Sequence, residues 1–304
     1  LGEIGRARAP GPLFASVVNV GLAVLDAGSE SQRHEYIPQL ASGTVIGTAA
    51  LLERDARYTP DAINLTARRV GDRYELTGSK MFVEHANAAD LMLVPVRTSS
   101  AAMPDVGLTI LLVPAGSSGI KLTRLESIAR DAQFEVSFQG VEVSADAVLG
   151  GVGDGWSVLK RALDRATVLH CAESVGGAQR VLEMTVEYAK QRVQFGRPIG
   201  SFQSVQHDCA DMVIAIDAAR LATYQAIARL EDGGPADREI ALAKILTDHA
   251  YKSTTLTAQQ IHGGIGFMEE YDLQLWTRRA RVAELKCGAS AQHRETFAAS
   301  MGLA

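Results

Sequence analysis

The sequence predicts an α+β protein in which N-terminal helices precede a middle β domain and a C-terminal bundle of long helices. Three observations support this fold class. Apolar residues recur at helical spacing over residues 1–45, short alternating and apolar runs fill residues 46–150, and the helical period returns over residues 151–304. We therefore expect three domains with these boundaries.

The first region contains "VVNVGLAVLDAGSESQRHEYIPQLASG", in which Gly28-Ser29-Glu30 is a helix stop followed by a new N-cap. This pattern indicates two helices, and a single pair cannot cover its own apolar face, so we expect it to pack on other helices. The sequence opens on Leu1 within a helix-like segment and shows no signal-peptide pattern, so we expect that the true N-terminus lies upstream.

The middle region carries strand signals of ordinary length. In "VGDRYELTG", Gly71-Asp72 separates two alternating segments, which is a hairpin signal. "LMLVPV" and "LTILLVP" are short apolar runs, and "QFEVSFQGVEV" alternates Phe134, Val136 and Phe138 with polar residues. The region is therefore predicted to be a barrel-like β domain.

The last region contains segments of roughly thirty residues with helical period, well above the mean helix length of about 11 to 12 residues. They predict a bundle of four long antiparallel helices. One stripe is formed by Val205, Cys209, Met212, Val213 and Ile216, and Asp232-Gly233-Gly234-Pro235 ends that helix.

Composition excludes several classes of function. The chain has 304 residues, 47% apolar and 21% charged, and a net charge of -5 without a basic patch, so we expect neither nucleic acid nor an anionic membrane as a partner. No apolar run is long enough for a membrane span. Three cysteines without a CxxC pair favour a reducing, cytoplasmic setting, and no metal-ligand spacing is present.

Two short motifs lie at helix ends. In "QRVQFGRPIGSFQ", Arg192 and Arg197 flank Phe195, and arginine there suits contact with phosphate or carboxylate, although it can equally complement a helix C-terminus. In "QQIHGGIGF", the glycines permit close approach of a ligand or form a simple C-cap and turn. His262 in that motif can titrate, but a lone histidine is more often structural.

This order of regions, with "RVQFGRPIGSFQ" and "QIHGGIGF" in register, resembles the acyl-CoA dehydrogenase family over essentially the whole chain, without roughly the first eighty residues of its N-terminal helical domain. The resemblance implies a tetramer in which FAD lies between the β domain of one subunit and the helical domain of its neighbour. It also implies an acyl-CoA substrate whose α-proton is taken by a Glu while a hydride leaves the β-carbon for the flavin. An electron-transfer flavoprotein or a similar protein then accepts the electrons.

The resemblance assigns residues to the neighbour's FAD. Arg192 and Phe195 correspond to the family's contacts with the diphosphate and adenine half of the cofactor. Gln260, Gly263 and Gly264 correspond to its Gln-x-x-Gly-Gly contact. All five residues are present, which favours the ligand interpretation of Arg192.

The subunit's own flavin cleft departs from the family pattern. In the Thr-Glu-x-x-x-Gly-Ser-Asp segment, Leu52 replaces the Thr, Glu53 remains and the Gly-Ser-Asp is lost. Phe82-Val83-Glu84-His85 stands where the family has Trp-Ile-Thr-Asn. Because Glu84 would bring negative charge near a ring that becomes anionic on reduction, we expect flavin binding in this cleft to be weak.

The family's usual catalytic Glu corresponds to Cys287, preceded by Lys286 in place of Tyr, and its second known base position holds Ala166. Thr167 replaces an orienting Arg, whereas Asp164 keeps a position associated with CoA adenine binding. A free thiol has a pKa of about 8.5 that Lys286 could lower. We nevertheless interpret Cys287 as a filler at a vestigial site.

Three functions remain open on the sequence. The first is a base-lacking subunit that completes the FAD site of a homologous partner, with fatty or steroid side-chain acyl-CoA esters as plausible substrates. The second is an active homo-oligomeric dehydrogenase whose base is Glu84 or Glu173. The third is a non-enzymatic acyl-CoA-binding or assembly protein, because a fold does not fix a function.

Overall fold

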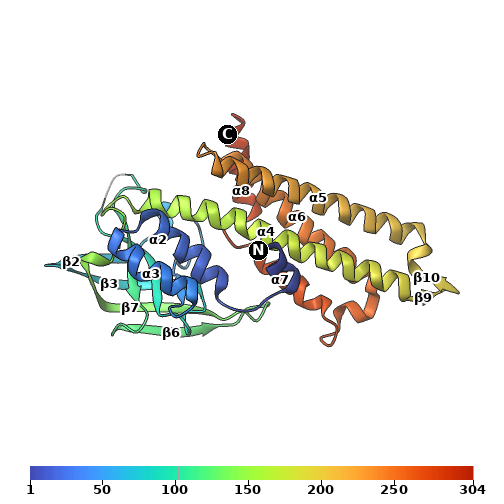
Figure 1. Cartoon of the computed structure of the whole chain (residues 1–304), viewed down its shortest axis with the longest axis horizontal. Helices are drawn as coiled ribbons and strands as arrows, with labels where there is room; N and C mark the ends of the chain where they lie inside the picture. Colours follow the sequence, from blue (N-terminus) through green and yellow to red (C-terminus); the bar gives the residue numbers. More distant parts are fainter. Residues whose placement is uncertain (101–102, 304) are drawn as a thin grey trace. The chain divides into compact units, whose positions relative to one another are not determined.

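A computed structural model describes residues 1–100 and 103–303. Contacts divide it into two compact units, residues 11–166 and residues 1–10 together with 167–304 (Figure 1). The dividing point lies inside one helix of 37 residues, α4 (Gly155–Gln191). We therefore describe the two units separately, and the three sequence domains with ends at residues 45 and 150 stay a prediction.

The unit of residues 11–166 begins with helices. A π-helix (Phe14–Gly21) runs into α2 (Leu22–Ala27), and α3 (Glu30–Ser42) follows. The expected N-cap is present, since the Ser29 hydroxyl accepts from the Gln32 N–H and the Gln32 side chain accepts from the Ser29 N–H. The Gln32 side-chain amide also donates to the carbonyls of Asp146 and Val148, which fixes α3 to the β domain.

The sheet of this unit has eight strands, in the order β6-β7-β3-β2-β4-β5-β8, with β1 beside β4. Their bounds are β1 (Gly47–Ala49), β2 (Thr66–Val70), β3 (Arg73–Glu84), β4 (Leu91–Arg97), β5 (Leu108–Pro114), β6 (Ile120–Leu125), β7 (Gln133–Ser144) and β8 (Val148–Leu149). Short 3₁₀ turns lie at Pro60–Ala62 (η2) and Ala145–Ala147 (η3). The predicted hairpin is confirmed, because Val70 pairs with Arg73 around a two-residue turn in which Gly71 has φ 62°.

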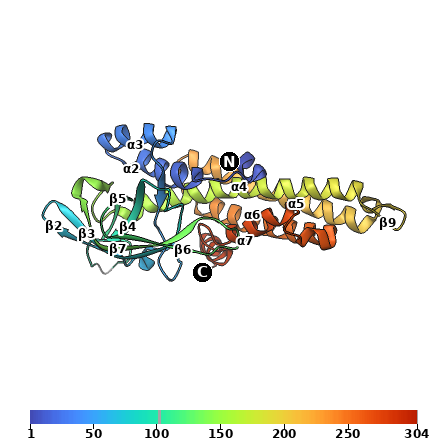
Figure 2. The ribbon, with the colours of Figure 1, turned by 90° about the horizontal axis from the view of Figure 1, so that it is seen from below.

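Strand β4 is buried on both faces and separates two cores. Met92, Val94 and Val96 enter a cluster enclosed by the sheet, and Leu91 and Leu93 enter a second cluster shared with the helices. Figure 2 shows α2 and α3 on one side of the strands. This double burial explains why "LMLVPV" is a continuous apolar run and not an alternating one.

The second unit is helical. It contains α1 (Gly2–Ala7), the later part of α4, α5 (Gln203–Glu231), α6 (Asp237–His262), α7 (Leu273–Ala283) and α8 (Ser290–Ser300). A short hairpin of β9 (Val193–Gln194) and β10 (Arg197–Pro198) and a 3₁₀ turn, η4 (Ile199–Ser201), connect α4 to α5, and a 3₁₀ turn, η5 (Gly263–Phe267), follows α6. The long helices are α4, α5 and α6. The helices α7 and α8 have 11 residues each and pack on α6.

The α5 stripe predicted from the sequence is only partly buried. Met212 and Ile216 lie in the bundle core and Val205 and Cys209 are half-buried, but Val213 is 42% exposed. One helical residue turns the side chain by about 100°, so Val213 lies at the edge of the face that Met212 and Ile216 share.

Candidate functional site

The hairpin of β9 and β10 connects α4 to α5 (Figure 1), and it is flanked by Arg192 and carries Phe195 in its turn. Phe195 is 93% exposed and has φ 52°, a left-handed conformation that is unusual for an aromatic residue. Arg192 is exposed, and within the described ranges its guanidinium group makes no recorded ion pair. Arg197, by contrast, lies 4.2 Å above the Phe202 ring and stabilises the hairpin. The tip thus holds an aromatic ring and a positive charge ready for a ligand.

The glycine motif lies at the end of α6. Gln260 is exposed, and Gly263 has φ 63° and ψ -140°, a conformation that side chains disfavour. A Cβ atom added to Gly263 or Gly264 would meet no described atom within 4 Å. This turn therefore leaves open space in which a ligand can approach the backbone.

The structure brings these two motifs to the same end of the bundle. The Tyr188 hydroxyl, four residues before Arg192, donates to the carbonyl of His262, the residue before Gly263 (3.3 Å). His262 is 4% exposed, and burial lowers the pKa of its ring, which the backbone bond to Ala258 opposes in part. His262 is therefore a neutral packing residue at neutral pH. Of the two interpretations of this histidine, a titrating group or a structural residue, the structure favours the second.

The residues that the family resemblance assigns to the subunit's own flavin cleft lie in the other unit. The pairing of β3 with β7 is interrupted between Lys80 and Val83, and at this bulge Phe82 has φ 57° and is 42% exposed. Leu52 contributes only backbone, since its carbonyl accepts from the Met81 N–H (2.8 Å). Its side chain cannot supply the hydroxyl donor that a Thr would.

Glu53 has a structural role that sequence reasoning missed. One of its carboxylate oxygens accepts from the Lys80 ammonium group at 2.9 Å and from the N–H groups of Asn64 and Leu65 at the same distance. Lys80 is fully buried, and burial lowers its pKa against the opposing effect of Glu53. The Lys80–Glu53 pair attaches the loop that contains Leu52 to strand β3. The Glu53 carboxylate is therefore already engaged in contacts that hold the fold together.

Cys287 lies in the short loop between α7 and α8. It is half-buried with φ 58°, and its carbonyl lies 2.8 Å from the His293 Nε2 atom. Because a carbonyl only accepts, that nitrogen carries the proton. The loop places a thiol where the family resemblance expects a carboxylate.

A buried ion pair on α6 holds both ends of this loop. Lys244 and Asp248 are 0% and 4% exposed, and the Lys244 Nζ atom lies 2.6 Å from each Asp248 oxygen. Lys244 also donates to the Ala283 carbonyl at the end of α7 (3.1 Å), and the Ser290 hydroxyl at the start of α8 donates to Asp248 (2.8 Å). The i, i+4 spacing of the pair within an apolar helix face was the available sequence signal.

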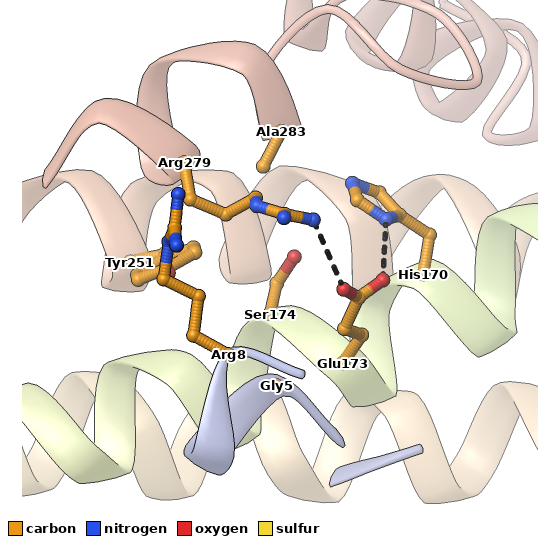
Figure 3. A pocket seen from close by; sticks show the side chains of 8 residues that line it. All are labelled: Gly5, Arg8, His170, Glu173, Ser174, Tyr251, Arg279 and Ala283. Carbon is orange, nitrogen blue, oxygen red and sulfur yellow. Dashed lines mark ion pairs between the residues drawn. The ribbon is translucent and has the colours of Figure 1, made fainter. Parts of the chain in front are cut away.

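Glu173 lies in a polar cluster of the same unit (Figure 3). Its carboxylate oxygens lie 3.6 Å from His170 and 3.5 Å from Arg279, and the cavity beside them is about 10 Å³. Burial raises the pKa of Glu173, but His170, Lys286 and Arg279 outweigh it and lower the pKa to about 2. A carboxylate with so low a proton affinity is a poor base for an α-proton, so the cluster argues against Glu173 as an alternative catalytic residue.

We expect the Glu173 cluster to make unfolding pH-dependent. The pKa of Glu173 falls from 4.5 to about 2 on folding, so its contribution is fully present above pH 4.5 and is lost as pH falls towards 2. At 1.36 kcal/mol per pKa unit this contribution is about 3 kcal/mol. Urea unfolding at pH 7 and pH 3 should show that Glu173→Gln loses stability at pH 7 and has a weaker pH dependence than the wild type.

Glu183→Gln is the matched control for that experiment. Glu183 also lies on α4, and Arg6 lowers its pKa, but the ion pair is at the surface, with the two side chains 44% and 31% exposed. Solvent screens such pairs, so the control should change the free energy of unfolding by less than about 1 kcal/mol. Equal effects of the two substitutions would contradict the assignment of Glu173.

The three other positions taken from the resemblance lie on α4. The Lys160 ammonium group, one turn earlier on the helix, donates to both carboxylate oxygens of Asp164 at 2.6 Å each. Ala166 and Thr167 are each 3% exposed. Asp164 is therefore engaged in an ion pair of its own helix, and its contact with CoA stays a prediction.

Across residues 1–100 and 103–303, no group of three or more metal-binding side chains is found, and no helix is long and apolar enough to cross a membrane. The strongest polar arrangements are the Lys244–Asp248 pair, the Lys80–Glu53 pair and the Glu173 cluster.

Comparison with known proteins identifies the family. Two family models match: the middle domain of acyl-CoA dehydrogenases over residues 48–141 and their C-terminal domain over residues 153–302. The short-chain specific acyl-CoA dehydrogenase of Megasphaera elsdenii is 32% identical over 282 residues, which is 91% of this chain and 73% of that protein. The chain therefore belongs to the acyl-CoA dehydrogenase family, and the fold class predicted from the sequence is confirmed.

Solved structures agree. Butyryl-CoA dehydrogenase from Megasphaera elsdenii matches with a TM-score of 0.91 and 30% identity, covering 95% of this chain and 76% of that one. The ChsE4-ChsE5 complex from Mycobacterium tuberculosis matches with a TM-score of 0.90 and 28% identity, covering 100% and 79%. Members of this family are FAD-dependent flavoproteins that act as oxidoreductases, as the sequence resemblance predicted.

Proposed function

We propose that this chain is the base-lacking subunit of a hetero-oligomeric acyl-CoA dehydrogenase and completes the FAD site of a homologous partner. The observation that carries the proposal is an asymmetry within the chain. The residues that would reach a neighbour's cofactor are exposed and open, whereas the position of the catalytic Glu holds Cys287.

The partner-facing residues fit the diphosphate and adenine half of FAD. Arg192 can donate two parallel hydrogen bonds to phosphate oxygens. Phe195 offers a ring that is 93% exposed, and Gly263 and Gly264 let the cofactor approach the backbone. Bound FAD supplies a hydride acceptor, and these residues bind and orient it.

The subunit's own cleft fits the flavin less well. Leu52 offers no side-chain donor, and the ionised carboxylate of Glu53, which only accepts hydrogen bonds, is held by Lys80 and two backbone N–H groups. Glu84 lies on the same strand as Phe82 and would oppose negative charge on a reduced flavin. We therefore propose that this cleft does not support turnover.

The division of labour follows from the reaction. Desaturation removes a proton from the α-carbon and a hydride from the β-carbon of the acyl thioester, so one carboxylate base and one flavin suffice for each turnover. The partner would supply the base and the flavin cleft, and this chain would supply the second wall of the cofactor site. A hetero-oligomer is supported by the ChsE4-ChsE5 complex, a similar solved structure that contains two differently named chains.

The proposal predicts the flavin content of purified protein. We expect the chain produced alone to carry no FAD, and a complex with a Glu-bearing homologue to carry fewer FAD molecules than subunits. Flavin absorbance against protein concentration measures this ratio, and turnover is followed with an artificial electron acceptor. A full FAD complement on the chain purified alone, with turnover that is lost in a Glu84→Gln variant, would favour the homo-oligomeric alternative instead.

Three finer assignments belong to the same proposal. The acyl group is a fatty or steroid side chain, the electrons pass to an electron-transfer flavoprotein or a similar acceptor, and the complex works in the cytoplasm. The last is supported by the absence of disulfides among Cys171, Cys209 and Cys287.

A further inference from the structure

Tyr188 is bonded at both of its ends. Its carbonyl accepts from the Arg192 N–H at 2.8 Å, and its hydroxyl donates to the His262 carbonyl at 3.3 Å. The carbonyl bond is the ordinary backbone bond that ends α4, and the hydroxyl bond joins the last turn of α4 to the last turn of α6. Because His262 ends α6 and precedes the turn η5, the hydroxyl bond attaches Tyr188 to the turn that carries Gly263.

Ring stacking reinforces this connection. The Tyr188 and His262 rings are stacked with centroids 4.3 Å apart and planes 21° apart, and the Tyr271 ring is tilted by 49° against His262 with centroids 5.3 Å apart. The His262 Nδ1 atom lies 2.8 Å from the Ala258 carbonyl, so that nitrogen carries the proton of the neutral ring. Three side chains from α4, α6 and the segment before α7 thus form one stack.

The stack lies between the two halves of the partner-facing site. Arg192 follows Tyr188 by one helical turn, Gln260 precedes His262 by two residues, and Gly263 follows it directly. Arg192, Phe195 and Gln260 are exposed, so the packing of their own side chains does not set their spacing. The Tyr188 hydroxyl bond to the His262 carbonyl directly links the two segments that carry them.

We propose that Tyr188 is a positioning residue that holds the hairpin with Arg192 and the glycine turn after His262 at the spacing that one dinucleotide requires. This inference rests on the proposed function and deepens it. A cofactor that touches both halves gains from a fixed spacing, because the ordering of the site is then complete before binding. A cofactor that touches neither half gains nothing.

Tyr188→Phe is the test, since it keeps the ring and the backbone bond and removes only the bond to the His262 carbonyl. In the complex with a Glu-bearing partner, we expect the affinity for FAD to fall about threefold to tenfold, as for loss of one neutral hydrogen bond. The affinity for FMN, which lacks the adenine half, should not change. Tyr224→Phe is the control, because Tyr224 is 61% exposed on α5 of the same bundle.

A second readout uses the isolated chain. Hydrogen exchange of the amides in Gly263–Phe267 should be faster in Tyr188→Phe than in the wild type and unchanged in Tyr224→Phe. An unchanged FAD affinity together with unchanged exchange would overturn the positioning role, and so would an equal loss of FAD and FMN affinity. If no partner complex retains flavin, the proposed function fails, and the exchange measurement still decides whether Tyr188 fixes the turn.

Discussion

Lys244→Ala is expected to lower the free energy of unfolding by about 3–5 kcal/mol, as is typical when one partner of a buried ion pair is removed. Lys244 is fully buried and holds both oxygens of Asp248 at 2.6 Å, so its loss leaves a buried carboxylate with only the Ser290 hydroxyl as a recorded donor. The loss also frees the Ala283 carbonyl at the start of the Cys287 loop. Urea unfolding at pH 7 measures the change.

The pH dependence of the variant gives a sharper test. Burial already raises the pKa of Asp248, and Lys244 opposes that rise. Without Lys244 the folded-state pKa rises further above the unfolded value, so the folded variant binds the extra proton. Stability of Lys244→Ala should therefore recover in part as pH falls from 7 towards 5.

Lys252→Ala is the matched control on the same helix. Lys252 pairs with Glu284 at 2.8 Å, but the two side chains are 42% and 24% exposed, so its removal should cost no more than about 1 kcal/mol. The assignment would be wrong if both variants lost the same free energy, or if Lys244→Ala lost less than about 1 kcal/mol.

Arg192→Ala is expected to weaken FAD binding by the partner complex about 10- to 100-fold, because a hydrogen bond to a charged group contributes about 1.5–3 kcal/mol. The thermal midpoint of the isolated chain should stay unchanged, since Arg192 is exposed and makes no ion pair recorded among the described residues. Fluorescence titration of FAD into the apo-complex measures the affinity. The affinity for riboflavin should not change, because riboflavin carries neither a phosphate nor the adenine half.

Lys190→Ala is the control for charge. Lys190 lies two residues away, carries the same charge, is exposed and pairs with Glu187 at 2.9 Å. It should leave FAD affinity within about twofold of the wild type at physiological salt, where exposed charges are screened. If Lys190→Ala and Arg192→Ala weakened binding equally, the effect would be general electrostatic attraction and not a specific contact.

Much of the fold followed from local patterns. The turn at Gly71-Asp72, the N-cap at Ser29 and the long helices were all predictable, since turn residues, capping residues and periodicity are local properties of the sequence. The position of Val213 was wrong, because a stripe assigned from apolar residues alone includes one that faces outward. Apolar character reports burial only on average.

The candidate site was less predictable. Local motifs drew attention to Arg192, Phe195 and the glycines, but only the family resemblance assigned them and Gln260 to a cofactor, and the structure shows that they are exposed or open, not that they bind one. The pair of Lys80 with Glu53 and the stacking of Tyr188 on His262 join residues distant in sequence. Such contacts depend on tertiary packing, which a single sequence does not report.

The exposed tip of the hairpin has a consequence for how the protein is made. The tip carries Phe195 at 93% and Val193 at 52% exposure on a short pair of strands, so a chain released from the ribosome without its partner displays an apolar surface beside an unpaired strand edge. We expect such orphan chains to aggregate or to be degraded. A cell that uses this subunit would then need to synthesise both chains in matched amounts, which favours genes that are transcribed together.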